Sequence, residues 1–243
     1  IPCCPHGNEQ SRSRPTPAVA SRPHLALASS ATIFKSFATA ACSLFSAASS
    51  RCNASASPAA AAGCRLLPTC AAASSGLARA HFRPVPNGRP RASLVLGHGV
   101  GRGVDSIDLV AIAEALPEDG IEVVLVEQPW RVEGRRLGGA ASTLDRAWVS
   151  SLRDVRSRGI GTKRLVVGGR SSGARVACRT VGEVEPAALL LLAFPLHPSR
   201  RATVTGPPPT RMPELVEAAR AVPSVVVQGT RDIQHEMLYV VRE

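Results

Sequence analysis

Short apolar runs alternate with amphipathic segments along the later two-thirds of the chain. The apolar runs are only a few residues long and rich in Val, Leu and Ile, which is typical of strands buried on both faces of a parallel sheet. They occupy residues 92–96, 121–127, 164–168, 187–194 and 224–228, and the pattern also allows a strand at 77–82.

Between these runs, apolar residues recur at positions i, i+3, i+4 and i+7, which predicts helices that each bury one stripe. The three stripes are Leu109, Ile112, Ala113 and Leu116; Leu144, Ala147, Trp148, Leu152 and Val155; and Met212, Leu215, Val216 and Ala219. We expect Asp105 to cap the first of these helices and Gly120 to end it. A further helix is expected directly after residue 173.

Strands that alternate with helices need crossover connections. The pattern therefore predicts an α/β fold with a doubly wound, mostly parallel sheet and helices on both of its faces. Ligands bind such sheets at the carboxyl ends of the strands. Polar residues that directly follow the predicted strands are therefore the candidates for function.

One strand end carries a motif for nucleophilic chemistry. Residues 169–173 read Gly-Arg-Ser-Ser-Gly and fit Gly-x-Ser-x-Gly, the nucleophile elbow of serine hydrolases. A serine on a sharp strand-to-helix turn brings the chain close to itself on both sides, where only glycine fits. The motif alone is weak, but the flanking strand and helix strengthen it. Ser171 is the candidate nucleophile.

Two other strand ends could supply the remaining parts of an acyl-transfer site. The loop 97–103 reads Gly-His-Gly-Val-Gly-Arg-Gly, and we expect the backbone N–H of Val100, beside His98 and Gly99, to hold an oxyanion. The second donor would be the N–H of Ser172. Asp232 follows the last predicted strand, where the acid of a Ser–Asp–His order belongs.

Five segments in order resemble the α/β-hydrolase superfamily: 94–101, 126–131, 167–175, 194–198 and 227–232. More narrowly, they are similar to its small dienelactone-hydrolase-like branch, whose relatives include a subunit of the NSL histone acetyltransferase complex and bacterial hydrolases of unassigned substrate. The resemblance covers residues 77–232. It implies a doubly wound sheet and a serine hydrolase.

The catalytic histidine is where the chain departs from this family. Such enzymes keep it in a loop after one further strand, whereas here His235 is the only histidine after Asp232. We therefore expect the last strand to be missing and the domain to be truncated at its C-terminus. His235 is the candidate base, against the reading that it is an exposed tail residue. His197 and Arg170 are candidates for shaping the pocket and binding substrate.

Two functions stay open at this point. The first is a serine hydrolase that transfers the acyl group of a small-molecule ester or thioester. The second is a non-catalytic or truncated copy of the fold that acts as a binding or scaffold module. The elbow favours the first function, and the absent late histidine favours the second.

Residues 1–76 have a different composition, dominated by Ala, Ser, Pro and Cys without a helical or strand period. We expect them to form a disordered extension: a transit peptide, a low-complexity leader or sequence foreign to the natural protein. The predicted α/β-hydrolase-like domain would comprise residues 77–243, after this extension. Six of the seven cysteines precede residue 81, so the domain contains only Cys178, which we expect to be a small buried residue. A domain with one cysteine is typical of a reducing compartment, and we expect the cytoplasm.

Charge and composition exclude several other classes. The net charge is +11, but seven basic residues against one acid in residues 1–80 supply more than half of that excess. With only 3% aromatic residues, we expect no nucleic-acid partner. No apolar run is long enough to span a membrane. No dinucleotide or phosphate-loop motif and no zinc spacing occurs, so we expect no cofactor and no metal.

Overall fold

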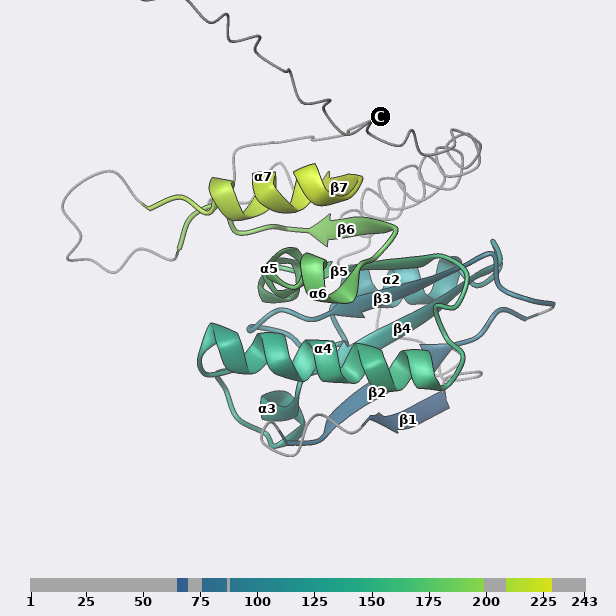
Figure 1. Ribbon diagram of the computed structural model, residues 1–243. Coiled ribbons are helices and arrows are strands. Elements are labelled where there is room, and N and C mark those ends of the chain that lie inside the picture. The colour runs from purple at the N-terminus through teal and green to yellow at the C-terminus, as the bar shows by residue number, and fades with distance from the viewer. Residues whose placement is uncertain (1–64, 70–75, 87, 199–208, 229–243) are drawn as a thin grey trace, which may run out of the picture.

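The computed structural model describes residues 65–69, 76–86, 88–198 and 209–228 (Figure 1). Seven strands form one sheet in the order β1-β2-β4-β3-β5-β6-β7. The strands are β1 (Arg65–Thr69), β2 (Ala78–Arg83), β3 (Ala92–Gly97), β4 (Ile121–Glu127), β5 (Leu165–Arg170), β6 (Ala188–Leu192) and β7 (Ser224–Val227). The five strands β4, β3, β5, β6 and β7 are parallel to their neighbours among these five. In contrast, β2 is antiparallel to β4, and β1 is antiparallel to β2. The predicted α/β fold with a mostly parallel sheet is confirmed.

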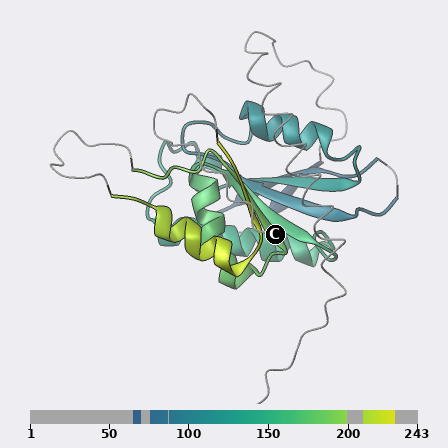
Figure 2. The ribbon, with the colours of Figure 1, turned by 90° about the horizontal axis from the view of Figure 1, so that it is seen from above.

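Helices cover both faces of this sheet (Figure 2). They are α2 (Ile107–Ala115), α3 (Pro129–Val132), α4 (Ala141–Ser157), α5 (Ser172–Arg179), α6 (Val181–Val184) and α7 (Met212–Ala221). Side chains alternate between the two faces along each strand, because successive Cβ atoms point in opposite directions. Leu94 and Leu96 therefore pack toward α2, whereas Val95 packs toward α4 and α5.

The central strands are buried on both sides, as their unbroken apolar runs predict. The stripe on α2 is also buried: Leu109, Ile112 and Leu116 are at most 3% exposed. Burying such a leucine or isoleucine side chain contributes about 1.5–3 kcal/mol. This apolar packing, rather than helix propensity, holds the parallel strands in register and aligns their carboxyl ends.

Several local predictions are wrong. Ser106, rather than Asp105, is the N-cap of α2, and its hydroxyl donates to the carbonyl of Gly103. A short helix, α3, for which the sequence carries no apolar stripe, follows β4, and Pro129 occupies its first turn with a backbone angle already suited to a helix. Val216 is 36% exposed and does not belong to the buried stripe of α7.

The boundary of the N-terminal extension also needs correction. Arg65–Thr69 forms strand β1, although residues 1–76 were expected to lack regular structure. Pro68 cannot donate a ladder hydrogen bond, and a strand that contains proline is tolerated at the edge of a sheet, where β1 lies. Residues 1–64 and 70–75 lie outside the described residues. So do residues 229–243, on which the expected loss of the last strand depends.

Candidate active site

The candidate nucleophile lies at the turn between β5 and α5. Ser171 has φ 53° and ψ −108°, a conformation that L-residues rarely adopt. Its N–H donates to the carbonyl of Leu192 on the neighbouring strand β6 at 2.9 Å, and its carbonyl accepts from the N–H of Arg175 at 3.2 Å. These two hydrogen bonds hold the turn between strand and helix. The side chain is half-buried at the carboxyl edge of the sheet.

The glycines on either side of Ser171 make room for a close approach of β3. A Cβ atom at Gly169 would lie 2.4 Å from the carbonyl oxygen of Gly97, and one at Gly173 would lie 2.5 Å from the same oxygen. Real Cβ atoms do not approach backbone oxygen that closely. The spacing of the motif therefore has a steric cause in this fold: both glycines face the backbone at the end of β3.

The loop after β3 packs directly on this turn. A Cβ at Gly99 would lie 3.4 Å from Cβ of Ser171 and 3.5 Å from the carbonyl oxygen of Arg170. The structure thus brings Gly99, Val100 and Ser171 to one edge. Val100 is 38% exposed. Ser172 opens α5, so its N–H belongs to the first turn of the helix, where backbone donors have no partner within the helix.

His98 is a fixed structural element of this loop. Its ring is buried, lies 5.4 Å from the ring of Trp130, and accepts the N–H of Gln128 at Nε2 over 3.0 Å. Since Nε2 accepts, the proton is on Nδ1, which donates to the carbonyl of Gly99 at 2.8 Å. Both ring nitrogens are therefore engaged by backbone groups. This hydrogen bonding ties the loop 98–100 to the end of β4.

This arrangement predicts a dependence of stability on pH. Burial lowers the pKa of His98 from its ordinary value near 6.5. The neutral ring thus stabilises the fold above about pH 6.5, and this contribution is lost as the pH falls below it, by at most about 1.4 kcal/mol per pH unit. We expect the free energy of unfolding of the His98→Gln variant to decline less between pH 6.5 and 5 than that of the wild type. Parallel curves in urea titrations would contradict the assignment.

Arg170 precedes the nucleophile and turns toward α2. Its Nε donates to Oδ2 of Asp108 at 2.8 Å. Asp108 lies in the first turn of α2 and is only 9% exposed. The ion pair fastens α2 to the residue next to Ser171. Arg170 thus borders the candidate site.

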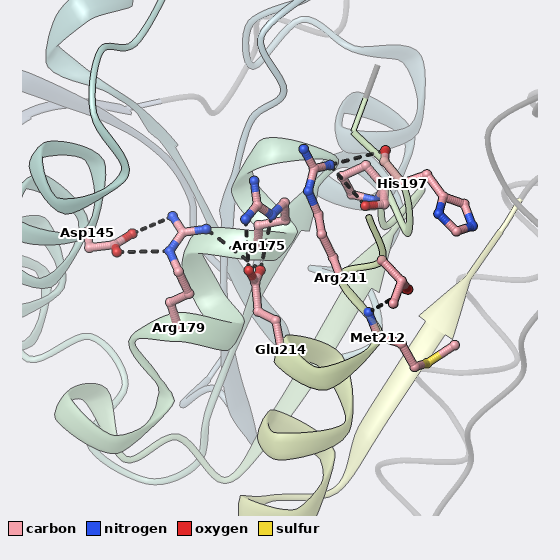
Figure 3. A network of polar contacts seen from close by, with 9 residues as sticks. Asp145, Arg175, Arg179, His197, Arg211, Met212 and Glu214 are labelled. Carbon is pink, nitrogen blue, oxygen red and sulfur yellow. Dashed lines mark hydrogen bonds and ion pairs between the residues drawn. The ribbon is translucent and has the colours of Figure 1, made fainter. Parts of the chain in front are cut away.

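A second network fastens the other side of the turn (Figure 3). Arg175 and Arg179, both on α5, bind carboxylates on neighbouring helices through two nitrogens each: Arg175 binds Glu214 of α7 at 2.8 and 3.1 Å, and Arg179 binds Asp145 of α4 at 2.6 and 2.9 Å. Glu214 thus occupies the guanidinium of Arg175, which joins α5 to α7.

His197 lies in the loop that follows β6. Arg211 donates through Nη1 to the carbonyls of Pro195 at 3.0 Å and His197 at 3.3 Å, which fixes the backbone of this loop to the start of α7 (Figure 3). The ring of His197 donates through Nδ1 to the carbonyl of Pro209 at 3.4 Å. The contacts of the described residues do not join this ring to Ser171. Asp232 and His235 lie outside the described residues.

Two of these contributions carry no signal in the sequence. Asp108 carries no mark in the sequence, because an acidic residue in the first turn of a helix is common whatever its partner. Gln128 contributes its backbone N–H, which every residue except proline possesses, so its identity signals nothing.

In the described residues no group of three or more His, Cys, Asp or Glu side chains could hold a metal ion. None of the described helices has the length and apolarity needed to cross a membrane.

A mostly parallel sheet covered by helices on both faces, with a serine on a strained strand-to-helix turn, is the arrangement of the α/β-hydrolase class. A family model described as alpha/beta hydrolase domain matches residues 90–237. This match spans more than half of the chain, and the chain therefore belongs to that family. No curated protein has a sequence that matches this chain.

Solved structures share the fold at low sequence identity. A serine hydrolase homologue from Coxiella burnetii is 15% identical, with 70% of this chain and 75% of that chain covered and a TM-score of 0.54. Thermogutta terrifontis esterase 2, phosphonylated by sarin, is 14% identical, with 71% and 75% covered and a TM-score of 0.51. A lidless a/b serine hydrolase from Xanthomonas campestris is 20% identical, with 71% and 74% covered and a TM-score of 0.49. The first two likenesses support the fold.

Proposed function

We propose that this protein is a serine hydrolase that cleaves a small-molecule ester or thioester by acyl transfer. The observation that carries the proposal is the backbone of Ser171, held at φ 53° between β5 and α5 with Gly99 of the adjacent loop packed against it. Such strain costs free energy, and proteins retain it mainly where it serves function. The hydroxyl of Ser171 would attack the carbonyl carbon and form an acyl-enzyme.

The N–H groups of Val100 and Ser172 would bind the developing oxyanion. Ser172 is the first residue of α5, and the partial positive charge at a helix N-terminus favours negative charge there. His98 contributes by position: its Nδ1–H binds the carbonyl of Gly99 and so fixes the peptide that carries the N–H of Val100. The ring is not a proton acceptor for Ser171, because Nε2 already accepts from Gln128.

The general base and its partner are assigned from the sequence. Asp232 would orient the ring of His235, and His235 would take the proton of Ser171 and deliver it to the leaving alcohol or thiol. The family match continues to residue 237, so both residues lie within the matched range. Within the family, the motifs at 94–101 and 167–175 favour the dienelactone-hydrolase-like branch.

The candidate site and Cys178 support a cytoplasmic enzyme without a cofactor. Cys178 is a free thiol that follows the turn on α5, and burial raises its pKa to about 12. A thiol so far from ionisation is inert, as is usual for a structural cysteine in a reducing compartment. The proposed reaction needs only the serine, its base and two backbone donors.

Covalent labelling tests the proposal. A fluorophosphonate reacts with a serine that has been activated as a nucleophile, and the adduct can be mapped by mass spectrometry to the peptide that contains Ser171. We expect the wild-type protein to be labelled and the Ser171→Ala variant to be unlabelled. If a folded wild-type protein is not labelled, the alternative function of a binding or scaffold module holds instead.

A further inference from the structure

We propose that Arg170, held in place by Asp108, binds a carboxylate on the substrate next to the scissile bond. This inference rests on the proposed function and specifies its substrate class: an ester whose acyl part carries a free carboxylate. Neither the fold nor the Gly-x-Ser-x-Gly motif requires an arginine at this position, so its use has to be argued from its contacts.

The contact with Asp108 fixes the direction of the guanidinium. One carboxylate oxygen, Oδ2, accepts from Nε of Arg170 at 2.8 Å, and the other, Oδ1, accepts from the backbone N–H of Leu109 at 3.0 Å. Asp108 is 9% exposed, whereas the side chain of Arg170 is 36% exposed. A buried anion that is anchored to the backbone of α2 thus holds a partly exposed cation.

The mode of contact differs from that of the structural arginines nearby. Arg175 and Arg179 each bind one carboxylate through Nε and Nη2 together, and Nη1 of Arg179 also pairs with Glu214 at 3.6 Å. Arg170 gives only Nε to Asp108, and its Nη1 and Nη2 have no hydrogen bond among the described residues. The outer edge of the guanidinium, with two parallel N–H groups, is the edge that binds a planar carboxylate in two places.

The free edge faces the loop that borders the nucleophile. Nη1 of Arg170 lies 3.9 Å from the position of a Cβ at Gly99, and Cβ of Ser171 lies 3.4 Å from the same point. A substrate whose carbonyl is placed against Ser171 and the N–H of Val100 would therefore meet this guanidinium. Since Asp108 already balances part of the positive charge, a monoanionic carboxylate fits better than a phosphate dianion.

Two esters that differ only by a methyl group on the distal carboxylate separate this proposal from a purely structural role. p-Nitrophenyl hemisuccinate carries a free carboxylate, and p-nitrophenyl methyl succinate is its neutral ester. We expect the wild type to favour the anionic ester in kcat/KM. We expect Arg170→Met to lower the anionic-to-neutral ratio roughly tenfold to a hundredfold, which corresponds to losing a charged hydrogen-bonded pair, mainly through KM. Arg170→Lys keeps the charge but not the paired N–H groups, so its anionic-to-neutral ratio should lie between those of the wild type and Arg170→Met.

Further variants control for charge and for folding. Asp108→Asn should lower the ratio less than Arg170→Met, because Arg170 is kept but no longer held. Arg158→Met removes the same charge from a pair with Asp154 near the end of α4 and should leave the ratio unchanged. If Arg170→Met and the wild type show the same ratio, Arg170 only fastens α2 to the turn and the proposal is overturned.

Binding of succinate tests the anion site without turnover. By titration calorimetry we expect the wild type to bind it and Arg170→Met, checked for an intact fold by circular dichroism, to bind roughly tenfold or more weakly. Equal binding by the two proteins would overturn the inference. A wild type that binds succinate but is not labelled by fluorophosphonate would keep the anion site and refute the hydrolase. A wild type that is labelled but does not prefer the anionic ester would support the hydrolase and refute the anion site.

Discussion

Replacing Gly173 by alanine is expected to destabilise the domain by about 3 kcal/mol or more. The new Cβ would lie 2.5 Å from both the carbonyl carbon and oxygen of Gly97, and 3.0 Å from the backbone nitrogen of His98. These are backbone atoms of β3 and its loop, and β3 is buried and paired on both edges. Neither β3 nor α5 can move away without breaking the packing at the centre of the sheet.

Gly182→Ala is the matched control. Gly182 also lies within a helix, α6, but nothing lies within 4 Å of the position of its Cβ. Alanine has the higher helix propensity, so this change should be neutral or stabilise the domain by up to about 1 kcal/mol. Urea unfolding followed by circular dichroism measures both variants. Equal effects of the two substitutions would mean that α5 does not approach β3 as closely as in the structure.

Glycines at the contact between β3 and the turn from β5 to α5 explain why the sequence predicts this turn. An element buried in the centre of a sheet tolerates few other residues. Where three backbone segments approach closely, small residues are required at fixed spacing, and this spacing is visible in the sequence. Gly97, Gly169 and Gly173 meet at one point although they come from two distant parts of the chain. The central strands are predictable for a related reason, since burial on both faces demands an unbroken apolar run.

The parts that the sequence did not predict depend on pairings between distant residues or on the edge of the sheet. Asp108 and Arg170 are 62 residues apart, and neither residue alone indicates the other. β1 is short, contains a proline and lies at the sheet edge, where a strand needs no alternating or continuous apolar pattern. The position of His98 follows from a backbone N–H of Gln128, 30 residues away, which leaves no signal in composition or spacing.

The two networks around the turn give the candidate site its rigidity. On one side Asp108 joins α2 to the end of β5 through Arg170. On the other side Glu214 and Asp145 join α7 and α4 to α5 through Arg175 and Arg179 (Figure 3). In the sequence, the strained residue Ser171 lies between Arg170 and the two arginines of α5. A strained backbone persists only when its surroundings determine it, and these ion pairs together with the buried strands do so.

Ser171→Ala is expected to abolish ester hydrolysis, and Ser172→Ala is expected to retain it. If Ser171 is the nucleophile, its loss should lower kcat by about a thousandfold to a millionfold, because residual catalysis would come only from oxyanion binding. Ser172 would act through its backbone N–H, which alanine keeps. Its replacement should therefore cost less than about tenfold.

Steady-state hydrolysis of p-nitrophenyl acetate measures both effects, and unfolding curves confirm that each variant is folded. Because alanine at 171 must also adopt φ near 53°, Ser171→Gly is the second variant: glycine relieves the strain while it removes the hydroxyl. A nucleophile requires both Ser171→Ala and Ser171→Gly to be inactive. If Ser171→Gly hydrolysed the ester as fast as the wild type, the hydroxyl would have no part in the reaction, and the strained turn would need another explanation.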